Sequence, residues 1–104
     1  MPEVTLADLA HEVRAKNAGP FWVTLEVFLR DAGGYRTAVS TVDEGVIARL
    51  YHVEAGTVRL FRIPALNVVK ISFPRPEGQG SLRDRDVHRG QHHVPLAGLR
   101  VGHP

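Results

Sequence analysis

The sequence predicts a small α+β domain with a mostly antiparallel sheet. Three observations predict it: alternating apolar residues that begin at Phe21, an amphipathic helical pattern around Ile47, and two apolar runs, 58–63 and 68–73, with a short break between them. The two runs predict a β-hairpin, which pairs its strands antiparallel. A chain of 104 residues is long enough for one hydrophobic core and too short for two. We therefore expect a single domain over residues 1–104.

The first strong pattern, residues 21–30, predicts a central strand. Apolar residues occupy its odd positions, while Thr24, Glu26 and Arg30 occupy even ones. This period of two is typical of a strand. Trp22 and Phe28 interrupt the polar side, so we expect both sides of the strand to be at least partly covered. Asp31-Ala32-Gly33-Gly34 then ends the strand.

A helix is predicted next. A short helical turn fits Tyr35–Val39, and a clearer amphipathic helix of about two turns follows, in which apolar residues recur at helical spacing. Ser40-Thr41-Val42-Asp43 offers hydroxyls that can cap its first turn. We expect the helix to stop near Gly56, which can take the left-handed conformation that closes a helix. The periodic residues are Val46, Ile47, Leu50 and Tyr51.

The hairpin's second strand predicts a sheet with one solvated face. In it Val69, Ile71 and Phe73 alternate with the polar Lys70 and Ser72. Prolines at positions 74 and 76 then predict an extended exit, because proline lacks the N–H that a sheet needs.

The two ends of the chain are less regular. Residues 77–89 are charged and poor in large apolar side chains, so we expect a long surface loop there. A final short strand that docks on the sheet is expected from Leu96, Leu99 and Val101. Residues 4–14 fit a helix through Leu6, Leu9, Ala10 and Val13, and they also fit a strand through Val4 and Leu6.

Composition limits the function. The chain has no cysteine, which excludes disulfides and thiolate metal sites, and no apolar run approaches the ~20 residues of a membrane span. The amino-terminal residues carry acids and no basic region of a secretory signal. We expect a cytoplasmic protein that does not bind membranes.

The charge of the chain favours small anions over nucleic acid. The formal net charge is +2, and of the thirteen basic residues only Lys16 and Lys70 are lysines. The planar guanidinium of arginine binds carboxylate and phosphate groups well. Such a small excess is far below the dense basic face of a nucleic-acid-binding protein. We expect a small anionic metabolite, such as a carboxylate or the phosphate of an acyl-CoA.

Residues 83–93 form the most polar stretch and include three histidines. His88 and His92 would align as metal ligands only in a helix, and Gly90 and Pro95 disfavour that helix. We therefore predict no metal and no cofactor. We interpret the stretch as a polar loop in which Asp84 or Asp86 pairs with nearby arginines.

A second polar cluster precedes the first strong strand. Lys16, Asn17 and Gly19 lie in a Lys-Asn-Ala-Gly-Pro segment just after Arg14. As a turn, this segment could present backbone N–H groups and the Lys16 ammonium to an anion. The alternative is a solvated turn that only leads into the strand.

Five motifs together resemble an uncharacterised family of small proteins that is associated with acyclic terpene utilisation proteins of the AtuA type. The resemblance covers nearly the whole chain. The motifs are Leu6-Ala7-Asp8-Leu9-Ala10, Arg14-Ala15-Lys16-Asn17-Ala18-Gly19-Pro20-Phe21, Ile47-Ala48-Arg49-Leu50-Tyr51, Asp84-Arg85-Asp86-Val87 and Gln91-His92-His93-Val94-Pro95-Leu96.

This resemblance implies a ferredoxin-like domain with helices on one face of the sheet, similar to the C-terminal domain of AtuA-like proteins. It also implies a larger AtuA-like partner. Asp84, Asp86, Gln91 and His93 carry the resemblance near the carboxyl end. The family pattern has a tyrosine at the position of His88, a small residue at Arg89 and a glutamine at His92, so tyrosine-based chemistry is not expected here.

Two functions follow as hypotheses. In the first, the chain is an accessory small subunit of an AtuA-like metabolic protein and helps form a carboxylate or acyl-CoA site from the Arg14–Gly19 segment and residues 83–93. In the second, it is a small hydratase or lyase in which His93 is the base and Arg14 or Lys16 holds the substrate carboxylate. Homo-oligomerisation through the sheet is compatible with both.

Overall fold

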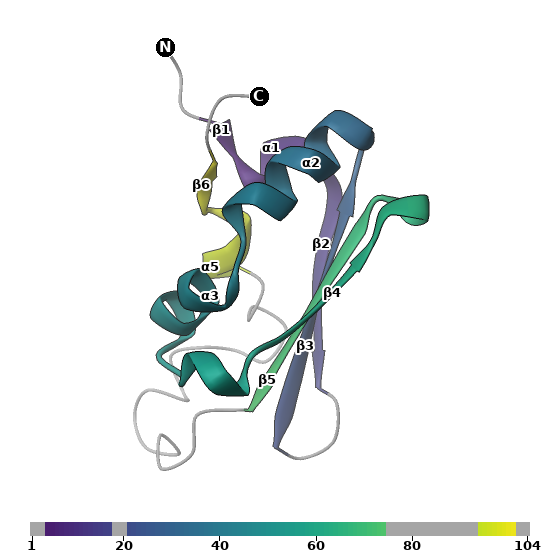
Figure 1. The fold of residues 1–104 in the computed structure, drawn as a ribbon. Helices are drawn as coiled ribbons and strands as arrows, with labels where there is room; N and C mark the ends of the chain where they lie inside the picture. Colours follow the sequence, from purple (N-terminus) through teal and green to yellow (C-terminus); the bar gives the residue numbers. More distant parts are fainter. Residues whose placement is uncertain (1–3, 18–20, 75–93, 102–104) are drawn as a thin grey trace.

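A four-stranded antiparallel sheet forms the centre of the molecule. The computed structural model describes residues 4–17, 21–74 and 94–101 (Figure 1). The strand order is β2-β3-β5-β4. These strands are β2 (Ala10–Asn17), β3 (Trp22–Leu29), β4 (Arg59–Ile63) and β5 (Val68–Pro74). The predicted strand after Pro20 and the predicted hairpin are both confirmed, and β3 is central as expected.

The helices lie together on one side of this sheet (Figure 1). They are α1 (Leu6–Leu9), α2 (Ala32–Thr41), α3 (Glu44–Tyr51) and α5 (Val94–Ala97), with two 3₁₀ turns, η1 (Ala55–Thr57) and η2 (Pro64–Leu66). The predicted α+β class, with an antiparallel sheet and helices packed against it, is confirmed. None of the helices in the described ranges is long and apolar enough to cross a membrane.

The connection between β3 and β4 is compatible with a ferredoxin-like fold. Both strands run antiparallel to β5, so they are parallel to each other with β5 between them. Helices α2 and α3 join them, which makes the split β-α-β unit of that fold. The remaining edge, beside β3, is filled by β2, which precedes β3 in the chain.

The core lies between the sheet and the helices. The odd residues of β3 and β5 face it and are buried, as the alternating pattern predicts. From the helical side come Ala38, Ile47 and Tyr51, and the ring centroids of Tyr51 and Phe73 lie 4.7 Å apart. The strand residues of the core are Val23, Leu25, Val27, Leu29, Val69, Ile71 and Phe73.

Aspartate side chains cap the N-termini of the two longer helices, α2 and α3. The Asp31 carboxylate accepts a hydrogen bond from the Gly34 N–H at 2.7 Å, and that of Asp43 accepts from the Val46 N–H at 2.9 Å. Hydroxyls of residues 40–43 were expected to cap α3, but Ser40 and Thr41 lie in α2 and the capping group is the Asp43 carboxylate. Helix α2 is longer than the predicted turn at Tyr35–Val39, because the cap at Asp31 stabilises a first turn that contains Gly33 and Gly34, two residues that do not favour a helix.

The end of α3 differs from the prediction. The helix ends at Tyr51, and the residue that takes the left-handed conformation is His52, with φ 60°. Gly56 instead lies within η1. A non-glycine residue in this conformation carries some backbone strain, which the packing of α3 on the core holds in place.

The two ends of the chain pair with each other, and the expectation of a final strand on the main sheet is wrong. Leu96 lies in α5, and β6 (Arg100–Val101) pairs antiparallel with β1 (Val4–Thr5) in a separate two-stranded sheet. The Leu6 N–H also donates to the Leu99 carbonyl at 2.8 Å. Of the two structures expected for residues 4–14, the strand is limited to β1 and the helix to α1, while Ala10 and Val13 lie in β2, a strand that the sequence did not predict. The expected extended exit after Pro74 and the expected loop at 77–89 lie outside the described residues.

Candidate functional site

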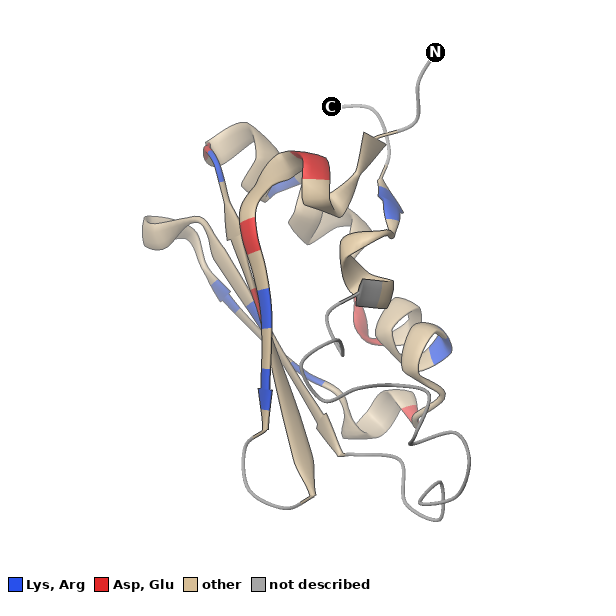
Figure 2. Ribbon diagram, turned by 180° about the vertical axis from the view of Figure 1, so that it is seen from behind, with Lys and Arg blue, Asp and Glu red and all other residues tan. Residues whose placement is uncertain are grey.

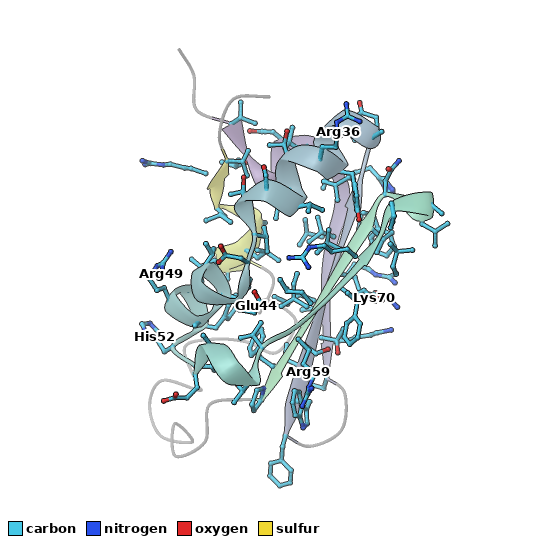
Figure 3. All side chains as sticks on the ribbon, viewed as in Figure 1. Arg36, Glu44, Arg49, His52, Arg59 and Lys70 are labelled. Atoms are coloured by element: carbon cyan, nitrogen blue, oxygen red, sulfur yellow. The ribbon has the colours of Figure 1, made fainter. Side chains whose placement is uncertain are left out.

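The face of the main sheet that is turned away from α2 and α3 carries the polar residues; we call it the open face. No element within the described ranges packs against it. Strand pairing arranges its side chains in cross-strand rows. In the row that we call the central row, Arg14, Glu26, Lys70 and Phe61 stand side by side on β2, β3, β5 and β4. Figure 3 shows Lys70 on the side of the sheet away from α3.

Glu26 organises this face. Arg14 donates from Nη2 to Glu26 Oε1 at 3.0 Å, and Lys70 Nζ lies 3.5 Å and Lys16 Nζ 3.9 Å from Oε2. The Glu26 side chain is only 6% exposed, whereas the three cations are 42–62% exposed. The carboxylate therefore lies beneath a layer of Arg14, Lys16 and Lys70, which we call the cation cluster.

The cations keep Glu26 ionised. Burial by itself raises the pKa of the Glu26 carboxyl, but the hydrogen bond from Arg14 and the charges of Lys16 and Lys70 outweigh it, so the pKa lies below its ordinary value. One carboxylate faces three cations, and the cluster keeps an excess of positive charge at neutral pH.

Arg14 is held by more than one neighbour. Its Nε lies 3.7 Å from Glu12 Oε2, and its guanidinium lies over the Phe28 ring, 5.1 Å from the centroid. A cation above an aromatic face is stabilised by the ring quadrupole. The guanidinium is thus placed before any ligand arrives.

Two further rows flank the central row. In one, Lys16, Thr24, Ser72 and Arg59 are aligned, and the Thr24 and Ser72 hydroxyls share a hydrogen bond at 3.0 Å. The Arg59 guanidinium lies 5.9 Å from the centroid of Trp22. The other row is apolar apart from its first member and aligns Glu12, Phe28, Val68 and Ile63. In the view from behind, Figure 2 shows acidic and basic residues along β2.

The structure brings together only part of the predicted site. Arg14 and Lys16 lie on the open face of β2, and neither is in a turn. Asn17 follows Lys16 in the strand and therefore points to the opposite side of the sheet. Gly19, Asp84, Asp86, Gln91 and His93 lie outside the described residues, as do His88 and His92. A pocket shared by Lys16 and His93 thus stays a prediction.

Two residues that sequence reasoning did not single out complete the cluster. The sequence contains one indication of them: both are polar residues at the even positions of strands whose odd positions are apolar. Their partners depend on strand register, which the alternation does not give.

The chemistry available on this face is the binding of anions. Arginine and lysine donate charge-assisted hydrogen bonds to carboxylate and phosphate oxygens. Within residues 4–17, 21–74 and 94–101, no three His, Asp or Glu side chains come close enough to hold a metal ion.

Comparison with known proteins gives one match. No curated protein and no solved structure matches the chain significantly. The model of one protein family, described as a domain of unknown function (DUF4387), matches residues 6–100. That range contains every strand of the main sheet, the whole cation cluster and α5. The chain therefore belongs to the DUF4387 family.

Proposed function

We propose that the chain is an accessory small subunit, or partner domain, of a larger AtuA-like metabolic protein and that it helps form a binding site for a carboxylate or an acyl-CoA. The observation that carries this proposal is the cation cluster. It holds Arg14, Lys16 and Lys70 on a sheet face that no described element covers, with one buried carboxylate between them.

Within the described residues, the geometry of the cluster supports anion binding better than acid–base catalysis by Glu26. The cluster supplies positive charge and hydrogen-bond donors, and Glu26 is kept ionised by its partners. A general acid or base needs a pKa near the working pH, whereas the surroundings of Glu26 move its pKa away from neutrality. Charge stabilisation is the contribution such a cluster can make to a site that a partner completes.

Co-expression tests the proposed partnership. The chain, produced together with an AtuA-like protein from the same genome, should elute with it as one species in size-exclusion chromatography at physiological salt. Separate elution of the two proteins at micromolar concentration would contradict the accessory role.

Ligand binding tests the proposed site in the resulting complex. Calorimetric titration with acetyl-CoA and with acetate should show binding that weakens about tenfold when Lys16 and Lys70 are replaced by Gln, since two charge-assisted contacts are lost. Arg36→Gln combined with Arg49→Gln is the matched control, because it removes two positive charges from α2 and α3. Equal affinity in both double variants would refute the site.

A further inference from the structure

We infer that the open face of the main sheet is the surface on which the larger partner docks, and that the partner presents to it a carboxylate-rich patch with an apolar centre. This inference rests on the proposed function, because it assigns a surface to the partner named there. It concerns the contact with the partner and draws on Lys16 and Lys70 of the same cation cluster, so a small anion bound by the cluster would lie within the interface.

The open face carries exposed aromatic and aliphatic side chains of the types that are found in protein interfaces. Phe61 ends the central row on the edge strand β4 and is 51% exposed. Phe28, Ile63 and Trp22 are partly exposed on the same face. Aromatic residues together with arginine are enriched in interface cores, and exposed apolar patches mark binding surfaces.

The charges of the face indicate which partner fits. Among the described residues of this face, four cations, Arg14, Lys16, Arg59 and Lys70, stand against the two carboxylates of Glu12 and Glu26, which leaves an excess of two positive charges. A second copy of the same face would bring like charges together, and this costs free energy. A carboxylate-rich surface is complementary and is therefore the favoured occupant.

The same charges make nucleic acid a poorer occupant. A phosphate backbone presents one charge after another and needs a continuous basic track. On this face the Glu12 and Glu26 carboxylates lie between the cations, 3.7 Å from Arg14 Nε and 3.0 Å from Arg14 Nη2. A few separate carboxylates can instead meet the exposed sides of the Lys16 and Lys70 side chains, which are 62% and 42% exposed, with Glu26 beneath them.

The cationic side chains are also partly ordered before docking. Arg14 lies over Phe28 and Arg59 lies over Trp22, while the two lysines are attracted to Glu26. Side chains that are already held lose less conformational entropy when an interface forms. The cationic side chains of the open face are therefore largely positioned before a partner binds.

The first experiment uses poly-L-glutamate as an acidic probe, titrated into ¹⁵N-labelled protein at low salt. Amide shifts should change on β2, β3, β5 and β4 and leave α2 and α3 unaffected. Lys16→Gln with Lys70→Gln should weaken binding about tenfold, whereas Arg36→Gln with Arg49→Gln, which has the same net charge, should not. Equal loss in both variants, or shifts confined to the helices, would overturn the inference.

The second experiment uses the co-expressed AtuA-like protein and does not depend on charge. Phe61→Ala should reduce capture of the partner, while Leu66→Ala on the same hairpin, 68% exposed, should not. Both side chains are exposed, so neither change should unfold the domain. If the unaltered chain captures no partner, the proposed function fails; if it does and Phe61→Ala captures equally well, only the docking surface fails.

Two competing occupants are outcomes of the same measurements. Tighter binding of a single-stranded oligonucleotide than of poly-L-glutamate at equal salt would overturn the assignment to an acidic protein. So would a dimer of the chain alone, detected by sedimentation, that is lost in Phe61→Ala.

Discussion

At the scale of single residues, Glu26 has the largest effect on the character of the open face. A lone buried carboxylate would be costly, and the 3.0 Å hydrogen bond from Arg14 with the nearby ammonium groups of Lys16 and Lys70 offsets that cost. Removing the carboxylate would leave three cations close together. Glu26, which lies beneath the cation cluster, therefore keeps its three side chains together.

The lowered pKa of Glu26 predicts an acid-sensitive stability. Because its pKa is lower in the folded protein, the Glu26 carboxyl binds protons more readily in the unfolded chain. Its contribution to the free energy of unfolding is therefore fully present above the ordinary pKa of 4.5, and it is lost as the pH falls through the lower pKa of the folded state. Glu26→Gln should cost about 1–3 kcal/mol at pH 7. The difference from the unaltered protein should shrink toward pH 3. Urea unfolding at several pH values measures both.

The control for this prediction is Glu54→Gln, which removes an exposed carboxylate outside the cluster. It should leave stability at pH 7 almost unchanged. A penalty for Glu26→Gln that is the same at every pH would contradict the role assigned to its charge.

At the scale of elements, the start of α2 shows how two neighbouring glycines can have different roles. A Cβ on Gly34 would lie 3.3 Å from the Leu9 carbonyl oxygen, whereas the nearest atom to a Cβ on Gly33 is Asp31 Oδ1 at 3.5 Å. Gly34 thus allows α2 to approach the end of α1 closely. Gly33 has no such neighbour.

Alanine substitutions should separate these two glycines. Gly33→Ala should raise the free energy of unfolding by about 0.5 kcal/mol, because alanine favours a helix and ordinary contact distances accommodate it. Gly34→Ala should lower it, since the Leu9 carbonyl would have to move. Thermal and urea unfolding of both variants check this, and a Gly34→Ala protein as stable as Gly33→Ala would show that the close approach is unimportant.

At the scale of the whole molecule, the C-terminal segment joins parts of the chain that are far apart in sequence. Strand β6 pairs with β1, and Leu96 in α5 is fully buried. The Leu96 N–H donates to the Tyr51 hydroxyl of α3 at 3.2 Å. Burial raises the pKa of Tyr51, so this hydroxyl stays neutral and serves as an acceptor. The segment is part of the core and not an appendage.

Truncation of Leu96 tests this view. Leu96→Ala should destabilise the domain by about 2–5 kcal/mol, the range for buried leucines. Leu66→Ala, at a side chain that is 68% exposed, should change stability by less than about 0.5 kcal/mol. Urea unfolding followed by tryptophan fluorescence of Trp22 measures both. A small effect of Leu96→Ala would mean that the segment folds apart from the core.

The sequence by itself determined the α+β class, the strand after Pro20, the hairpin and the sides of β3 and β5 that carry polar residues. Those features follow from local periodicity and turn residues. Only the tertiary structure decided that Arg14, Glu26 and Lys70 stand in one row and that β6 pairs with β1. Both depend on register and on contacts between distant parts of the chain, which local patterns do not encode. For the same reason Arg14 and Lys16 were expected in the site, while Glu26, which holds them there, was not.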